Sequence, residues 1–85
     1  MADYNVEIKK SAARELGALP PKDCARVVAR IQALAKEARP HGCEKLTADD
    51  KFRLRPGNYR ILYQIDDAAR LVTVVRIADR KQAYR

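Results

Sequence analysis

The sequence has few of the residues from which metal sites and disulfide frameworks are built. It contains two cysteines, one histidine and no tryptophan. Cys24 and Cys43 lie far apart, with only His41 near either of them, whereas a zinc site needs about four ligands in closely spaced pairs. We therefore expect two free thiols, no bound metal and no cofactor.

Long apolar runs and acidic residues are also scarce. No run approaches the roughly 18–20 apolar residues that span a bilayer, and Met1 to Tyr4 lack the features of a signal peptide, so we expect a cytoplasmic protein with no membrane partner. Only 11 Asp and Glu stand against 18 Lys and Arg, and the net charge is +7. This excess favours nucleic acid, an anionic membrane or an acidic protein as partner. The length of 85 residues predicts one domain, 1–85.

Residues 51–65 contain no acidic residue and form two alternating runs around Pro56-Gly57-Asn58. Alternation around a Gly-Asn turn is the strongest short-range signal for a β-hairpin. With Gly57 and Asn58 as a two-residue loop, one face of the hairpin is apolar and the other is cationic. The predicted cross-strand pairs are Leu54 with Ile61, Phe52 with Tyr63, and Arg55 with Arg60.

The cationic face of this hairpin is expected to carry Lys51, Arg53, Arg55 and Arg60. Like charges opposite each other cost some tenths of a kcal/mol per pair, so we expect a group outside the fold to compensate them. Guanidinium groups on a rigid sheet suit phosphate, because they present a fork of donors and do not titrate. The alternative is an ordinary solvated face, which the single sign of the charges disfavours. The acids Glu7, Glu15, Glu37 and Glu44 are expected on outer faces or in loops, away from these cations.

Two helices are predicted before the hairpin. Tyr4, Val6 and Ile8 alternate with polar residues, as in a strand with one buried face. A short helix capped by Ser11 follows and ends before Pro20. A second helix, starting at Pro21, carries a clear 3.6-residue apolar stripe.

The run 71–77 is rich in β-branched residues, which is typical of an inner strand buried on both faces. The predicted order is therefore β-α-α-β-β-β. We expect an α+β fold in which an αα-hairpin packs on one face of an antiparallel sheet.

Arg76 and Arg80 are expected to leave the last strand close to the cationic face, with Tyr84 after them. Several cations, one tyrosine and no metal ligands suit cleavage of RNA through its own 2′-hydroxyl. That reaction develops negative charge on a five-coordinate phosphate and needs no nucleophile from the protein. Tyr84 would either transfer a proton, with its pKa lowered by neighbouring cations, or stack on a base.

These residues resemble the RelE family of bacterial toxins. The resemblance covers nearly the whole chain, and its most specific part is Gly57-x-Tyr59-Arg60-x-x-Tyr63 together with the closing Ala83-Tyr84-Arg85. It implies a RelE-like fold and a metal-independent endoribonuclease, an mRNA interferase, which cuts mRNA in the ribosomal decoding site formed by 16S rRNA. It also implies inhibition by a RelB-like antitoxin, with a monomeric free toxin and a hetero-oligomeric complex.

The resemblance also implies the roles of the site residues. Basic residues at the positions of Lys51, Arg53, Arg60 and Arg80 bind and polarise the scissile phosphate, and Tyr84 assists the 2′-hydroxyl; we assign Arg55, Arg76 and Lys81 to RNA binding. Asp79 departs from the family, because many relatives carry a histidine or a basic residue there. The segment from Arg80 to Tyr84 is also shorter than in some members.

Two other functions remain open. ParE-like toxins share this architecture but bind and poison DNA gyrase without nuclease activity. A plain RNA-binding module would need surface aromatic residues for stacking, and we expect Tyr59 and Tyr63 on the core side. In either toxin interpretation an acidic antitoxin segment would wrap the basic face, with marked salt dependence.

Overall fold

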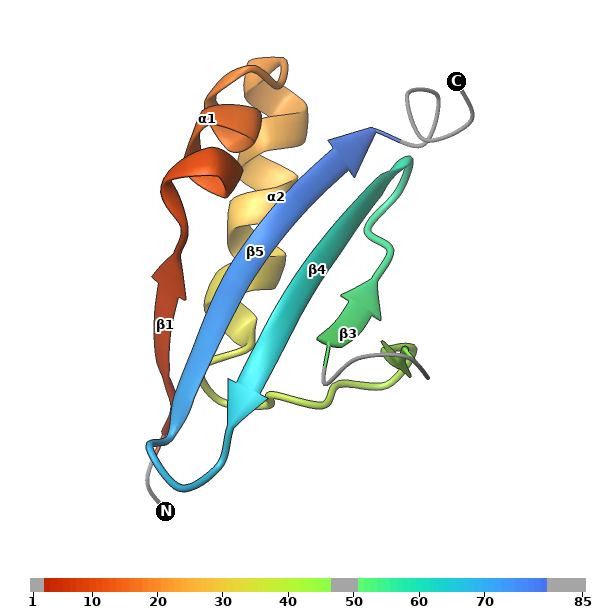
Figure 1. Ribbon diagram of the computed structural model, residues 1–85. Helices are drawn as coiled ribbons and strands as arrows, with labels where there is room; N and C mark the ends of the chain where they lie inside the picture. The colour runs from red at the N-terminus through yellow and green to blue at the C-terminus, as the bar shows by residue number, and fades with distance from the viewer. Residues whose placement is uncertain (1–2, 47–50, 80–85) are drawn as a thin grey trace.

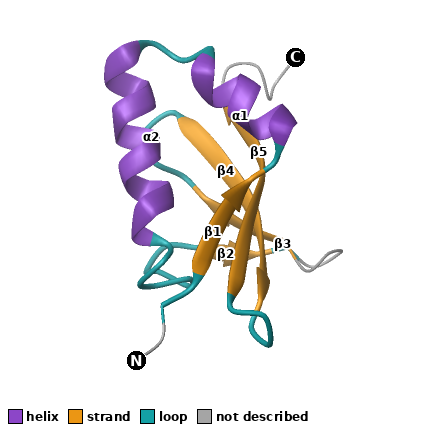
Figure 2. Ribbon diagram, turned by 90° about the vertical axis from the view of Figure 1, so that its left-hand side faces the viewer, coloured by secondary structure: helices purple, strands orange, loops and turns teal. Residues whose placement is uncertain are grey.

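The computed structural model describes residues 3–46 and 51–79, which form a five-stranded sheet and two helices (Figures 1 and 2). In chain order the elements are β1 (Asn5–Ile8), α1 (Lys10–Gly17), α2 (Pro21–Ala33), β2 (Glu44–Lys45), β3 (Lys51–Leu54), β4 (Tyr59–Asp66) and β5 (Leu71–Asp79). The strand order is β1-β5-β4-β3-β2. The predicted α+β order is confirmed, with the two-residue β2 added. The sheet is mixed rather than wholly antiparallel, because β1 runs parallel to β5.

The hairpin of β3 and β4 has the predicted register. Leu54 pairs with Ile61 and Phe52 with Tyr63. Gly57 has a φ of +63°, and the Tyr59 amide donates to the Pro56 carbonyl at 3.2 Å, which closes a two-residue turn led by glycine. The expected pair of Arg55 with Arg60 is absent from the described ladder, because β3 ends at Leu54.

The two helices begin directly after extended residues. Ser11 lies inside α1 and not at its cap, so that prediction is wrong: the cap is Lys9, which makes no side-chain capping bond. Lys9 is held by backbone bonds instead, since its amide donates to Val74 of β5 and its carbonyl accepts from Ala13. Pro21 opens α2 as predicted.

The helices leave one face of the sheet uncovered. Figure 1 looks onto this open face, with α2 behind β5, and Figure 2 shows α2 lying along the other face. α1 packs against β5, beside the part of that strand that β1 does not reach. The buried core between α2 and the sheet consists of Ala12, Val27, Ile31, Leu34, Ala38, Leu54, Tyr59, Ile61, Tyr63, Val72, Val74 and Ile77.

β5 is an inner strand, as predicted, but only one of its faces is buried. Val72, Val74 and Ile77 are buried, whereas Arg76 is exposed. A β-bulge interrupts the pairing with β4: Tyr63 pairs with Val74 and Leu62 with Arg76, so Val75 is an extra residue. The run of β-branched residues therefore gave no sign that one side of the strand faces solvent. It also gave no sign that a bulge shifts the alternation of inward and outward side chains.

Cys24 and Cys43 are free thiols, as predicted. Within residues 3–46 and 51–79, no helix is long and apolar enough to cross a membrane. In the same part of the chain, no group of three or more His, Cys, Asp or Glu residues could hold a metal ion.

Candidate functional site

The open face collects the basic residues that the hairpin pattern singled out. Arg53 of β3 lies opposite Leu62 of β4, and Leu62 lies opposite Arg76 of β5. Directly opposed residues point to the same side of a sheet, so two arginines flank one leucine in a row across three strands. Arg60 shares this face because it alternates with the buried Ile61. Lys51 lies one step away, opposite Gln64.

The bulge at Val75 is what brings Arg76 onto this face. Val72 and Val74 point into the core, and uninterrupted alternation would turn residue 76 inward as well. The extra residue shifts the phase, so that Ile77 is buried and Arg76 joins Leu62. Bulges re-aim side chains in this way beside functional sites.

Glu44 lies among these cations, contrary to the expectation that it would sit elsewhere. It pairs with Arg53 in the β2–β3 ladder, and its Oε2 is 3.2 Å from Arg53 Nη2. Its Oε1 lies 3.9 Å from Nε of Arg55, an exposed residue just after β3. Glu44, a residue of the fold itself, therefore offsets part of the repulsion between these basic residues. The two-residue strand that positions Glu44 left no signal in the sequence.

Glu15 is a second carboxylate that the sequence reasoning placed away from the site. Its Oε1 accepts the Ile77 amide at 2.8 Å, and its Oε2 lies 3.6 Å from Arg76 Nε. β1 pairs only with residues 71–74 of β5, so beyond Val74 this edge of β5 lies beside α1, which packs against the strand. Glu15 therefore accepts a hydrogen bond from the backbone of β5 and forms an ion pair with the neighbouring Arg76.

These ion pairs leave the arginines able to exchange partners. The side chains of Arg55, Arg76 and Glu44 are more than half exposed, and exposed pairs contribute only about 0–1 kcal/mol. Arg53 is held more firmly, with 22 % of its side chain exposed. Its Nε is buried and has no hydrogen-bond acceptor among the described residues.

The described tyrosines all donate their hydroxyl protons within the fold. Tyr59 donates to Asp23 at 2.7 Å, and that bond raises the pKa of Tyr59 to about 12. Tyr63 donates to the Ala38 carbonyl at 3.0 Å, and burial raises its pKa as well. Both rings lie on the core side, as expected. Neither tyrosine is therefore suited to transferring a proton on the open face at neutral pH.

Asp23 and Tyr59 also fix the position of the hairpin turn on α2. Their hydrogen bond joins the first turn of α2 to the start of β4, directly before Arg60. A Cβ placed on Gly57 would lie 3.1 Å from Nη1 of Arg26, so the side chain of Arg26 packs closely against the turn. Arg80, Lys81 and Tyr84, which complete the predicted site, lie outside the described residues.

Comparisons with known proteins agree with this architecture. Residues 6–84 match the family model for the ParE toxin of the type II toxin-antitoxin system, parDE. The chain is 36 % identical to Toxin RelE of Mycobacterium tuberculosis over 85 residues, which cover 96 % of this chain and 87 % of the relative. The chain belongs to the RelE/ParE family of type II toxin-antitoxin toxins.

Other relatives extend the match within the RelE/ParE family. Toxin RelG of M. tuberculosis is 34 % identical, and the alignment covers 96 % of this chain and 97 % of RelG. Among solved structures, the M. tuberculosis toxin-antitoxin complex RelBE2 aligns with a TM-score of 0.82 and 33 % identity, over 92 % of this chain and 99 % of that one. The archaeal RelE-RelB complex from Pyrococcus horikoshii aligns with a TM-score of 0.83 and 27 % identity, over 92 % and 96 %. The predicted RelE-like toxin fold is thereby confirmed.

Proposed function

We propose that this toxin is a ribosome-dependent endoribonuclease that cleaves mRNA without a metal ion. The observation that carries the proposal is the row of Arg53, Leu62 and Arg76 across three strands, with Arg60 on the same face. Cations placed on both sides of a short apolar gap suit a phosphodiester whose negative charge increases during reaction. The resemblance to RelE toxins supports the choice of mRNA on the ribosome as substrate.

The reaction proceeds by attack of the 2′-oxygen on the adjacent phosphorus. The new P–O2′ bond forms as the P–O5′ bond breaks, which leaves a 2′,3′-cyclic phosphate and a 5′-hydroxyl. One proton leaves the 2′-hydroxyl and one reaches the 5′-oxygen. Arg53 and Arg60 stabilise the charge on the two non-bridging oxygens of the phosphate, which is greater in the transition state than in the bound substrate.

The resemblance to RelE toxins supports the roles of the scissile-phosphate residues and of Tyr84, whereas the RNA-binding roles are our own assignment. Lys51, Arg53 and Arg60 hold the scissile phosphate together with Arg80, while Arg55, Arg76 and Lys81 bind the neighbouring RNA backbone. Tyr84 assists proton transfer. A RelB-like antitoxin inhibits the toxin, a role supported by the RelE-RelB complex of the Pyrococcus horikoshii relative, and its acidic groups would compete for the open face.

The test is mapping of new 5′ ends in cellular mRNA after a short induction of the toxin. We expect cuts inside translated codons, and their loss in Arg60→Ala. Arg30→Ala, on the exposed side of α2, removes the same charge away from the open face and is the matched control. Cleavage that persists in a folded Arg60→Ala, Arg80→Ala double variant would refute the assignment of the site.

A second candidate is poisoning of DNA gyrase by a ParE-like mechanism. The observation in its favour is the family model, which describes ParE toxins. In that case induced cells would stop replicating DNA and accumulate gyrase-linked breaks while their messages stay intact. That outcome would replace the nuclease proposal.

A further inference from the structure

A pocket of about 440 Å³ lies on the open face, next to the turn between β4 and β5. That turn joins the two strands at the bottom of Figure 1. Two cross-strand pairs line the pocket, Gln64 with Thr73 and Asp66 with Leu71. Gln64 and Thr73 alternate with buried residues of the core, so their side chains stand on the open face. The pocket therefore shares a surface with the basic residues of the candidate site.

The pocket lies one step along the strands from the basic residues. Lys51, Gln64 and Thr73 form a row across β3, β4 and β5. This row runs beside the one that contains Arg53 and Leu62, two residues away along β4, which is roughly 7 Å. A nucleotide whose phosphate is held by the basic residues can therefore place its base in the pocket.

The side chains of the pocket suit the edge of a base better than a phosphate. The amide of Gln64 and the hydroxyl of Thr73 each donate and accept hydrogen bonds. Asp66 accepts the Ala69 amide at 3.0 Å through Oδ1, and an ionised carboxylate has room for further donors. Leu71 adds an apolar surface for a ring. Donors and acceptors of this kind read base edges, whereas cations hold the backbone.

The charges around the pocket are mixed, so the hydrogen-bond pattern identifies the ligand and the net charge does not. Asp67 also lines the pocket, but both of its carboxylate oxygens already accept hydrogen bonds within the fold. Arg70 precedes Leu71 and is exposed, and Lys51 pairs with Gln64. These two cations offset part of the acidic charge. Asp66 is the carboxylate of the pocket that can accept a donor from a ligand.

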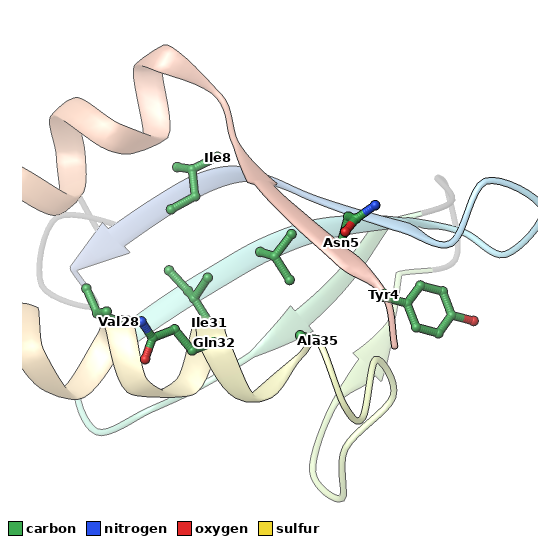
Figure 3. A pocket seen from close by; sticks show the side chains of 8 residues that line it. Tyr4, Asn5, Ile8, Val28, Ile31, Gln32 and Ala35 are labelled. Carbon is green, nitrogen blue, oxygen red and sulfur yellow. The ribbon is translucent and has the colours of Figure 1, made fainter. Parts of the chain in front are cut away.

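A second pocket of similar size fits a base less well. It has a volume of about 450 Å³ and lies between β1 and α2, away from the open face. Figure 3 shows Ile8, Val28 and Ile31 directed into it. These apolar side chains offer no hydrogen bond to the edge of a base. Position and chemistry therefore both favour the pocket beside the β4–β5 turn.

We propose that the pocket beside the β4–β5 turn binds one base of the RNA and selects a base that carries an exocyclic amino group. The inference rests on the proposed endoribonuclease function and adds base selection to the same face. Asp66 accepts a hydrogen bond from the amino group of cytosine, whereas uracil presents a carbonyl oxygen at that position, which a carboxylate repels. Gln64 and Thr73 bond the other polar atoms of the base edge.

The direct test compares the binding of two non-cleavable 2′-O-methyl RNA hexamers, hexacytidylate and hexauridylate, by fluorescence anisotropy at neutral pH. The two hexamers carry the same phosphates and differ only at the base edge. We expect the wild-type chain to bind hexacytidylate at least about fivefold more tightly. Asp66→Asn keeps an oxygen for the Ala69 amide and should narrow this preference to within about twofold. Glu37→Gln removes the same charge from an exposed residue outside the pocket and should keep the preference.

Substitution of the two neutral residues separates base contacts from phosphate contacts. Gln64→Leu and Thr73→Val should each lower the affinity for hexacytidylate about threefold or more, without changing the slope of log affinity against log salt, because no phosphate contact is lost. Arg60→Ala should weaken both hexamers alike and reduce that slope by about 0.7. Gln32→Leu removes the same amide from an exposed position on α2 and is the matched control. Thermal unfolding of each variant checks that it folds.

Failure of the base pocket and failure of the nuclease proposal give different results. Equal affinity of the wild-type chain for the two hexamers, or binding of neither, would overturn the base pocket. A cytidine preference that persists in folded Asp66→Asn would overturn it as well. These measurements use purified protein and leave mRNA cleavage to the mapping of 5′ ends. Intact mRNA in induced cells, together with a cytidine preference that Asp66→Asn removes, would refute the nuclease and retain the pocket.

Discussion

Arg39 and Asp67 form a two-point ion pair, with Nη1 3.1 Å from Oδ1 and Nη2 2.9 Å from Oδ2. Tyr4 donates its hydroxyl to the same carboxylate. The guanidinium also lies 5.3 Å from the ring centroid of Phe52, and Phe52 stacks on Tyr63. One arginine therefore joins the chain before β1, the β4–β5 turn and the β3–β4 hairpin.

Replacement of Asp67 by Asn should flatten the acid dependence of stability. The Arg39 hydrogen bonds, followed by that of Tyr4, lower the pKa of Asp67 to about 2. Between pH 4 and 2 the folded carboxylate stays ionised while the unfolded one takes up a proton, so stability falls as the pH falls. Urea unfolding across this range should show a shallower slope for Asp67→Asn than for wild type. Glu37→Gln is the control, and an equal slope in all three proteins would contradict the role of the pair.

Replacement of Glu44 by Gln should strengthen binding of RNA to the open face. The carboxylate occupies donors of Arg53 and Arg55, and an exposed pair of this kind is worth up to about 1 kcal/mol. We expect roughly two- to fivefold tighter binding of a non-cleavable 2′-O-methyl RNA at low salt, measured by fluorescence anisotropy, with a smaller gain at high salt. Glu37→Gln removes the same charge elsewhere. Weaker binding by Glu44→Gln would mean that Glu44 positions Arg53 instead of competing with phosphate.

Gly57→Ala should destabilise the hairpin turn. The φ of +63° costs an L-residue about 1–2 kcal/mol, and the new methyl group would press on Arg26. Chemical denaturation should show a loss of that size. Gly17→Ala is the control, because a Cβ at Gly17 meets no atom within 4 Å. If Arg26→Ala restores part of the loss in a double-mutant cycle, the contact with Arg26 is confirmed; full additivity would leave backbone strain as the whole cause.

Tyr63→Phe should lower the free energy of unfolding by about 1–2 kcal/mol. The substitution keeps the buried ring but leaves the Ala38 carbonyl without its hydroxyl donor. The slope of the denaturation curve should stay constant, since the folded surface is unchanged. RNA binding should also stay constant, because the Tyr63 ring lies on the core side. A loss of RNA binding without a loss of stability would contradict this purely structural role.

The parts of the fold that local pattern controls were predictable. Alternation and the Gly57 turn set the pairs Leu54–Ile61 and Phe52–Tyr63, and the 3.6-residue stripe identified α2. The bulge at Val75 was not predictable, because β-branched residues fit a strand whether they point into the core or away from it. The parallel pairing of β1 depends on contacts between the two ends of the chain.

The basic residues of the candidate site were predictable from the sequence, but the acidic residues that pair with them were not. The basic residues follow from alternation along β3 and β4. The acids Glu44 and Glu15 reach Arg53 and Arg76 only through a two-residue strand and a helix packed at the end of β5. Such contacts are set by tertiary packing, which a local pattern does not encode.

The pairing of β1 with β5 also constrains the order in which this chain folds. Asn5 of β1 pairs with Leu71 of β5, so β1 has no strand to pair with until most of the chain has been made. Contacts so distant in sequence form slowly, because the intervening loop must close before they gain any energy. During synthesis the β3–β4 hairpin is complete before β5 is made, and β1 is the first strand made but among the last to be paired. Until β1 pairs with β5, the apolar side chains of β1 are exposed and can bind other molecules in the cell.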